Sequence, residues 1–475
     1  MRSGWPARSG WPAPVTDREE IAARLSHLWG SPVTVTEPTP LAGGASRQTS
    51  RFTAGAGGQT RELVLRRDSS GRAGAAAMDN EGRVMRAAAA AGVPVPEVVD
   101  SGPSLGGAPY VLMSHVAGET IPRKLLRDEA YAAVRPALAA QFGAIAARIH
   151  SIPAGELATL PCQEPIEALR ARSRAYDVPR PSVEIGIAWL LRTIAAAGDA
   201  DVPRAVVHGD LRNGNAIVGP EGIRAVLDWE LAHRGNPVED LGWLCVKAWR
   251  FGSRLPVGGF GTRAQLLDGY QQAAGWRPAD GQLHWWEVYG TLRWVLLCRQ
   301  QAVVHLTGGN DSLEHAVIGR RVCEAEFDLL LALGLTRPHP VQDPLAGVDD
   351  APAQATGRAP HDAPDADRLL AVVSRSLAAG ELGGSLPAGT PRFLARVAAN
   401  AIRIARREIL LGRELDERRQ RRLSDLGFAS DEELALAIRA GAIEPDAPAV
   451  VRAVADTVHD KLLVANPRYL GQPAE

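Results

Sequence analysis

Residues 206–230 read VVHGDLRNGNAIVGPEGIRAVLDWE. Apolar runs at 204–208 and 223–228 are expected to form short strands on either side of a polar loop. The loop holds Asp210 and Asn215, and Asp228 ends the second strand. An Asp on a tight loop can accept a hydroxyl proton, whereas an amide oxygen and a second carboxylate are hard ligands that suit Mg²⁺. Because Mg²⁺ is usually held by one or two side chains plus phosphates, these groups predict a site for a magnesium-bound phosphate compound and a hydroxyl.

The order and spacing of these groups match a kinase catalytic loop. The triplet HGD is followed by Asn215, five residues after Asp210, and then by a strand that ends in Asp228. On these residues the chain resembles the aminoglycoside phosphotransferase-like family, a branch of the protein-kinase-like fold that has HGD where protein kinases have HRD. The resemblance covers roughly residues 20–335. It implies Asp210 as the catalytic base, Asn215 and Asp228 as ligands of Mg²⁺, and ATP (or GTP) as the phosphoryl donor.

The same resemblance assigns nucleotide-binding residues upstream. The strand LVLR ends in Arg66 where a Lys is expected, and Arg binds phosphate as a planar fork rather than as a point charge. Glu81, in the helix that follows, is expected to pair with Arg66. Gly43, Gly44 and Ser46 are expected in the loop over the phosphates, because paired glycines let backbone N–H groups approach an anion closely.

Two further groups of residues follow from the family match. Met113 is expected beneath the adenine, and the backbone of Ser114 and Val116 is expected to face the adenine edge. Asp240 is expected to brace the catalytic and metal loops by hydrogen bonds. His208 is predicted to be a packed loop anchor, because Asp210 occupies the place of the general base.

The pattern of apolar residues predicts which elements surround this loop. An antiparallel meander is expected upstream, with Gly-rich turns between its strands. Leu138, Phe142, Ile145 and Ile149 recur at helical spacing and predict one buried helix face. The expected strands are residues 33–35, 47–53, 62–66, 97–101 and 110–113, and the expected helices include 16–30, 75–91 and 184–197.

The predicted fold class is α+β: a bilobal protein-kinase-like fold, with a small β-rich N-lobe and a helical C-lobe, followed by a separate all-α C-terminal domain. The C-terminal region resembles an uncharacterised helical module that is often appended to such phosphotransferases. The expected parts are a disordered extension (1–15), the N-lobe (16–117), the C-lobe (118–336), a Pro/Ala/Asp-rich linker (337–367) and the C-terminal module (368–475).

Composition narrows the class of protein. The 475 residues carry 53 basic and 54 acidic side chains, a net charge of −1, which gives no reason to expect nucleic-acid or membrane binding. No stretch is long and apolar enough to predict a spanning helix, and the first 30 residues lack a signal-peptide layout. The four cysteines are scattered and form no C-x-x-C pair, as expected for reduced thiols in a cytoplasmic protein.

The acceptor is expected to be a small molecule with a hydroxyl group. Residues 251–335 hold eight Asp/Glu and seven Arg, so no acidic pocket for a polycationic aminoglycoside is evident. Trp276, Trp285, Trp286 and Trp294 are consistent with an apolar or flat acceptor, although core packing explains them as well. The segments VLRR and GVPVPEV resemble a subgroup that includes the kinase-like domain fused to certain acyl-CoA dehydrogenases, which implies a hydroxyacyl-CoA, with an antibiotic-like alcohol as the other option.

Two other readings stay open. A protein kinase is disfavoured because Gly209 replaces the HRD arginine and no A-P-E element follows Asp228. A nucleotide-binding pseudokinase that acts as a protein-interaction module is kept open by Arg66 and by the incomplete Gly loop. The C-terminal helices also leave room for self-association or for a protein partner.

Overall fold

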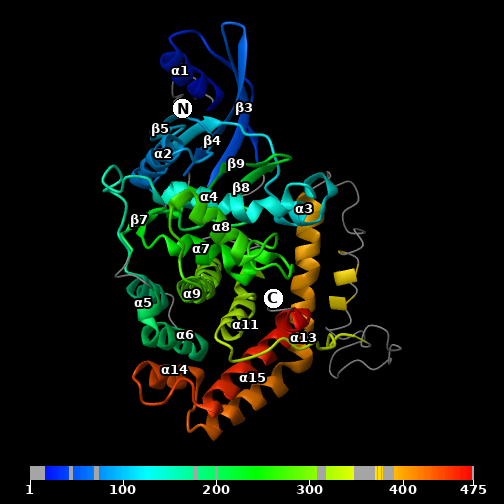
Figure 1. Cartoon of the computed structure of the whole chain (residues 1–475). Coiled ribbons are helices and arrows are strands. Elements are labelled where there is room, and N and C mark those ends of the chain that lie inside the picture. Colours follow the sequence, from blue (N-terminus) through cyan, green and yellow to red (C-terminus); the bar gives the residue numbers. More distant parts are fainter. Residues whose placement is uncertain are drawn as a thin grey trace, which may run out of the picture.

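The computed structural model shows two lobes, one above the other in Figure 1, with the last helices packed against the lower lobe. The N-terminal residues form the β-rich upper lobe, and most helices lie below it. The predicted extension 1–15 and residues 347–367 of the predicted linker lie outside the described residues. The structure describes residues 17–41, 47–68, 74–175, 179–197, 202–307, 317–346, 370–371, 373–375, 377 and 390–472.

The N-lobe contains one antiparallel sheet with the order β1-β3-β4-β6-β5, and β2 pairs with β3 on the side. Gly57 and Gly58 make the tight turn between β3 and β4, and both have the positive φ that such a hairpin turn requires. The antiparallel meander expected from the sequence is therefore present. The strands are β1 (Thr34–Val35), β2 (Thr39–Pro40), β3 (Gln48–Ala56), β4 (Gln59–Arg67), β5 (Val98–Leu105) and β6 (Ala108–Ser114).

Successive side chains of β4 point to alternate faces of the sheet. Leu63 and Leu65 are buried in the cluster that contains Ile21 and Leu25 of helix α1 (Asp17–Trp29). Successive side chains of a strand point to opposite faces, and Val64 accordingly packs with the cluster that contains residues of helix α2 (Gly74–Ala90). This register places Arg66 on the α2 face of the sheet, toward the lower lobe.

The polar loop of the C-lobe is more structured than the sequence predicted. Strand β7 (Ala205–Val207) pairs with β10 (His233–Gly235), not with the second apolar run. That run forms β9 (Gly222–Val226), which pairs with the additional strand β8 (Ala216–Gly219). A turn connects β8 directly to β9, and all four residues of β8 are buried in the fold.

Helices make up the rest of the C-lobe. Its α-helices are α3 (Pro122–Arg127), α4 (Leu138–His150), α5 (Pro165–Ala175), α6 (Pro181–Arg192), α7 (Val238–Cys245), α8 (Arg263–Ala274), α9 (Asp280–Leu306) and α11 (Val322–Ala332). Short 3-10 helices are η1 (Glu129–Tyr131), η2 (Arg135–Ala137), η3 (Ile194–Ala197), η4 (Trp229–Leu231), η5 (Lys247–Arg250) and, near the end of the chain, η7 (Pro467–Gly471).

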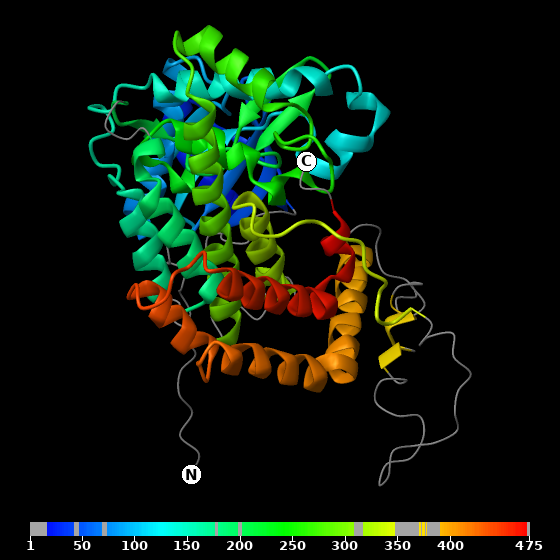
Figure 2. The same ribbon diagram turned by 60° about the horizontal axis from the view of Figure 1, so that its bottom comes forward.

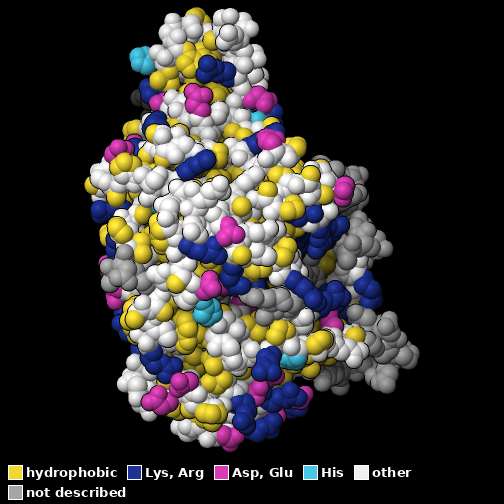
Figure 3. Space-filling view, in the orientation of Figure 1, with side chains coloured by type: hydrophobic (Ala, Val, Ile, Leu, Met, Phe, Trp, Pro, Cys, Tyr) yellow, Lys and Arg dark blue, Asp and Glu magenta, His cyan; other side chains and the backbone are white. Residues whose placement is uncertain are grey.

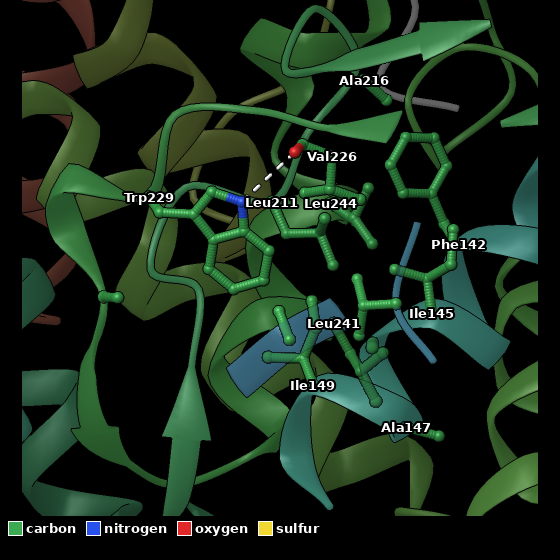
Figure 4. Packing of buried hydrophobic residues seen from close by; sticks show 14 of the residues in the cluster. Phe142, Ile145, Ala147, Ile149, Leu211, Ala216, Val226, Trp229, Leu241 and Leu244 are labelled. Carbon is green, nitrogen blue, oxygen red and sulfur yellow. Dashed lines mark hydrogen bonds between the residues drawn. The ribbon is translucent and has the colours of Figure 1, made fainter. Parts of the chain in front are cut away.

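Helix α4 forms the centre of the C-lobe core. Its four predicted core residues, Leu138, Phe142, Ile145 and Ile149, are all buried. Figure 4 shows how side chains of this face lie among those of the catalytic loop and α7, beside the indole of Trp229, which donates to the Val226 carbonyl at 3.2 Å. The polar loop is thus built directly on the largest apolar cluster of the protein.

Tryptophan side chains divide between core and partly exposed positions. Trp285 and Trp286 are buried within α9, edge to face with each other. Trp276 and Trp294 are only partly buried against the core clusters. Core packing therefore accounts for the first pair, and neither of those two indoles is available to an acceptor.

The C-terminal helices are α13 (Thr390–Asp425), α14 (Asp431–Arg439) and α15 (Pro448–Ala465), and Figure 2 shows them crossing the end of the C-lobe. Ser430 caps α14 by accepting the Glu433 N–H at 3.1 Å. Basic and acidic side chains are interspersed over this part of the surface (Figure 3), where the charged run 413–422 pairs largely within itself and with neighbouring helices. No helix within the described ranges is long and apolar enough to cross a membrane.

A glycine contact tests the packing of α4 on α8. A Cβ on Gly143 would lie 2.7 Å from the Tyr270 nitrogen and would also overlap the Leu266 carbonyl. Gly143→Ala should therefore lower the free energy of unfolding by roughly 1–3 kcal/mol, as measured by urea denaturation. Gly281→Ala is the matched control, because nothing lies within 4 Å of its added Cβ. That variant should be neutral or more stable by about 0.4–1 kcal/mol, and an equal loss in both variants would contradict the packing argument.

Candidate active site

The HGD triplet needs its glycine for steric reasons. Gly209 has a φ of +76°, and a Cβ there would lie 2.5 Å from the carbonyl oxygen of Leu231. An L-residue would be strained by the backbone angle and would also collide with η4. The absence of the protein-kinase arginine at this position is therefore a requirement of this loop.

Asp240, on α7, holds the backbone of the loop in place. Its carboxylate accepts the N–H groups of His208 and Gly209 at 2.8 and 2.9 Å, and His150 Nε2 lies 3.2 Å from it. The group is fully buried, which opposes ionisation, but hydrogen bonding to His150 and to the loop holds the pKa of Asp240 below its ordinary value. His150 is in turn bonded to the Tyr270 hydroxyl at 3.1 Å.

His208 ties the two halves of the motif together. Its Nδ1 accepts the Asp210 N–H at 3.1 Å, and its Nε2 faces the Leu227 carbonyl at 3.0 Å. Because Nδ1 accepts an N–H, the ring proton lies on Nε2, which donates to the Leu227 carbonyl. Burial lowers the pKa of His208. Both ring nitrogens are thus engaged with backbone on the two sides of the loop.

The carboxylate of Asp210 is surrounded by three donors. Trp243 Nε1 and Arg212 Nε contact its Oδ1 at 2.8 and 3.1 Å. Asn215 Nδ2 donates to its Oδ2 at 2.6 Å and to its carbonyl at 3.0 Å. Oδ1 has both lone pairs engaged, whereas Oδ2 has one left for another donor.

Asp228 lies beside this pair at the end of the hairpin. The Leu227 N–H donates to the Asn215 carbonyl at 2.8 Å, so backbone pairing holds the two segments next to each other. Asp228 has a φ of +69°, a left-handed conformation that non-glycine residues rarely adopt and that is frequent at functional sites. Its Oδ1 is 2.5 Å from Arg66 Nη2, and although burial opposes ionisation, Arg66 keeps the pKa of Asp228 below its usual range.

A network of arginines and carboxylates joins the two lobes. Glu81 is buried on α2, and its Oε1 accepts from Arg66 Nη1 at 2.8 Å. The other oxygen of Glu81 is paired with Arg47, which also lies 3.2 Å from Glu230. Burial and the neighbouring Arg66 lower the pKa of Arg47. Arginine side chains nevertheless stay protonated in proteins, so the guanidinium is charged.

Sequence reasoning missed Arg47 and Glu230. Their positions carried a signal, because Arg47 directly follows the Gly-rich segment and Glu230 closes the Asp228-Trp229-Glu230 triplet. The predicted phosphate-loop residues Gly43, Gly44 and Ser46 lie outside the described residues.

The expected adenine-binding segment runs from the end of β6 into the connection between the lobes. Met113 is buried on the same face as the α2 cluster. Ser114 donates its N–H to the Glu97 carbonyl and accepts the Glu97 N–H on its hydroxyl, both at 2.9 Å. The Ser114 amide is therefore occupied within the sheet.

Aromatic side chains support the catalytic loop from the α7 side. The Arg212 guanidinium lies 4.5 Å from the ring centre of Trp249, and the rings of Trp243 and Trp249 are 5.2 Å apart. Arg293 lies over the other ring, 4.9 Å from the centre of Trp243. Sequence reasoning did not assign Trp243, Trp249 or Arg212 to the site. The contacts of the two tryptophans join segments that are distant in sequence, whereas Arg212 lies within the motif, two residues from Asp210.

The side chains available as metal ligands limit how a metal ion could be bound. Within the described part of the chain, no group of three or more His, Cys, Asp or Glu side chains could hold a metal ion. Asn215 makes both of its contacts to Asp210 through Nδ2. Among the described residues, none donates a hydrogen bond to Asn215 Oδ1. Asn215 and Asp228 thus offer two hard oxygens that fit Mg²⁺ if phosphates complete its shell.

Comparisons with known proteins find a matching family for each of the two parts of the chain. Residues 37–286 match the phosphotransferase enzyme family, and residues 385–469 match a domain of unknown function (DUF6285). Acyl-CoA dehydrogenase family member 10 of Mus musculus is 32% identical over 219 residues, which are 42% of this chain and 19% of that protein. Member 11 of the same family from Gallus gallus is 31% identical over 35% of this chain and 22% of its own length. The chain therefore spans about a fifth of these relatives.

The fold has a solved counterpart. A provisionally assigned aminoglycoside phosphotransferase from Ralstonia eutropha JMP134 superposes with a TM-score of 0.51 at 21% identity, over 65% of this chain and 95% of that one. The bilobal kinase-like fold predicted from the sequence is thereby confirmed. Because the family match covers more than half of its residues, this chain belongs to the phosphotransferase enzyme family.

Proposed function

We propose that this chain transfers the γ-phosphate of ATP (or GTP) to a hydroxyl group of a small molecule, with Mg²⁺ bound at Asn215 and Asp228. The observation that supports this most is the direct contact of Asp210 with Asn215, next to an Asp228 that is linked through Arg66 to Glu81. The proposal thus joins a base, two metal-ligating oxygens and a phosphate-binding cation in one place.

Asp210 is proposed to bind the acceptor hydroxyl through Oδ2. Its other oxygen is saturated by Trp243 and Arg212, which orients the carboxylate. Phosphoryl transfer passes through a loose transition state in which the protein mainly positions and neutralises, so Asp210 takes the hydroxyl proton late. Asn215 and Asp228 would hold a magnesium ion, which would supply positive charge to neutralise the phosphates.

Arg66 and Arg47 are proposed to bind the phosphates that are not transferred. Both guanidinium groups are held by the buried carboxylate of Glu81, so they are oriented before nucleotide binds. Fixing charges in advance reduces the cost of ordering them during the reaction. Arg66 would then share the space beside Asp228 with the nucleotide phosphates.

The acceptor is proposed to be a hydroxyacyl-CoA, with an antibiotic-like alcohol as the second option. Arg212 lies 3.1 Å from Asp210, so a polycationic amino-sugar would meet a guanidinium beside the base. An anionic CoA ester would be attracted by the same charge. The matching relatives are named as acyl-CoA dehydrogenase family members, which supports this choice of acceptor.

A nucleotide-binding pseudokinase is the alternative, and one contact favours it. Arg66 is bonded directly to Asp228, so a proposed metal ligand is already neutralised by a protein cation. In that case nucleotide would bind without transfer. Incubation with ATP or GTP, Mg²⁺ and hydroxyacyl-CoA esters, macrolides or amino-sugars distinguishes the two functions through acceptor-dependent release of the nucleoside diphosphate.

Asp210→Asn should lower kcat by about 10²–10⁴-fold, because the general base is lost, while ATP binding is largely kept. Asp228→Asn should lower kcat and should also lose metal-dependent nucleotide binding. Steady-state kinetics and nucleotide titration measure the two effects separately. Asp268→Asn is the control, since this exposed residue of α8 pairs with Arg277 on the surface. Near-normal turnover by Asp210→Asn would refute the assignment of the base.

Arg66→Ala should raise the KM for ATP by about 10-fold or more, because a charge-assisted contact to phosphate is lost. The KM for the acceptor should change little. Arg51→Ala provides the comparison, because Arg51 lies on the adjacent strand and pairs with Glu62 at the surface. If both variants kept the wild-type KM for ATP, Arg66 would not be the phosphate-binding cation.

A further inference from the structure

The C-terminal helices share an apolar core with the C-lobe. Ile185 of α6 and Phe327 of α11 lie in the same buried cluster as Leu434 of α14 and Val454 and Leu462 of α15. Figure 2 shows α15 lying across the end of the C-lobe, close to α11. The C-terminal helices are therefore packed into the fold of the phosphotransferase.

Three buried acidic residues on α11 depend on this packing. Glu324 accepts from Asn466 at 2.8 Å, Glu326 lies 3.4 Å from the Lys461 ammonium, and Asp328 accepts from the Tyr469 hydroxyl at 2.6 Å. A buried carboxylate that loses a partner pays a large desolvation penalty. The segment from Lys461 to Tyr469 thus supplies partners that α11 needs.

Asp328 extends this contact toward the catalytic side of the lobe. Its other oxygen accepts from Lys247 Nζ at 2.8 Å, and the same ammonium lies 4.0 Å from the ring centre of Tyr469. Burial raises the pKa of Asp328, and the ammonium of Lys247 and the hydroxyl of Tyr469 oppose this. Tyr469 therefore contacts both members of the Lys247–Asp328 pair.

Lys247 begins the short helix η5, which leads directly to the aromatic support of Asp210. Backbone hydrogen bonds run from Trp249 N–H to Val246 and from Val246 N–H to Trp243, at 3.0 and 3.2 Å. Trp243 donates to Asp210, and Trp249 lies beneath Arg212. Arg250 fixes the far end of η5 by bonding to Glu287 of α9 at 2.8 Å. The helix is thus anchored at one end by α9 and at the other by Tyr469, through Asp328 and Lys247.

We propose that Tyr469, in the domain of unknown function, is a positioning residue for phosphotransfer: it fixes Lys247 through Asp328, and so holds η5 with Trp249, and the adjoining Trp243 of α7, against the Asp210 loop. This inference rests on the proposed function and gives the C-terminal helices a role in the reaction. Tyr469 does not touch the reacting atoms, so its effect is on the geometry of Asp210.

Tyr469→Phe tests the proposal with the full-length chain, because it removes the hydroxyl and keeps the ring beside Lys247. The kcat should fall by about threefold to 10²-fold, as expected for a small displacement of a catalytic group, with the KM for ATP unchanged. Amide hydrogen exchange should increase across residues 247–250. In a Lys247→Met background the same substitution should add little, since the path is already broken.

Arg439→Gln is the matched control. Arg439 crosses the same interface from α14 to Glu184 of α6 at 2.7 Å, but it makes no contact with η5. It should leave kcat and exchange at 247–250 unchanged. Wild-type kcat and exchange in Tyr469→Phe would overturn the proposal, as would equal effects of the two variants. If the wild-type chain showed no turnover, the proposed function would fail, and exchange at 247–250 would still decide whether Tyr469 fixes η5.

Discussion

The buried carboxylate of Asp240 is the group on which the geometry of the HGD loop depends. A charge without access to water is tolerable only when donors surround it, and here two loop N–H groups and His150 do so. The same bonds force the chain through the left-handed turn at Gly209. Because Asp240 lies on α7, which also carries Trp243, one helix fixes both the backbone of the loop and the carboxylate of Asp210.

The link between the lobes follows from strand register. A shift of one residue in β4 would turn Arg66 toward α1 and bury it among leucines. In the observed register Arg66 reaches Glu81 and Asp228 together, so the N-lobe sheet is connected by charge to the end of the C-lobe hairpin. Arg47 adds a second cation from the neighbouring segment, and Glu81 serves both arginines. The positions of these two guanidinium groups are therefore set by local alternation and one buried acid.

Much of this arrangement could be predicted from local sequence patterns. The rest depends on contacts between residues that are distant in sequence. The HGD loop and the buried face of α4 could be predicted because spacing and periodicity encode them. The pairing of Arg66 with Glu81 was expected from the family resemblance. Strand β8 could not, since its four residues were read as part of the loop and their pairing with β9 depends on the tertiary fold. Trp243 and Arg47 were missed for a related reason: their partners are far away in sequence. The roles of the site residues in nucleotide and metal binding stay predictions.

The acidic residues of α11 explain why the C-terminal helices dock in one arrangement. An apolar face alone would accept several registers of a partner helix, because hydrophobic contact is non-directional. Glu324, Glu326 and Asp328 are all buried, and each finds a donor from a different residue of the C-terminal segment. A shifted register would leave at least one buried carboxylate without that donor, at a cost of several kcal/mol. The pairs therefore penalise other arrangements, and the same constraint brings the Tyr469 hydroxyl to Asp328, next to Lys247.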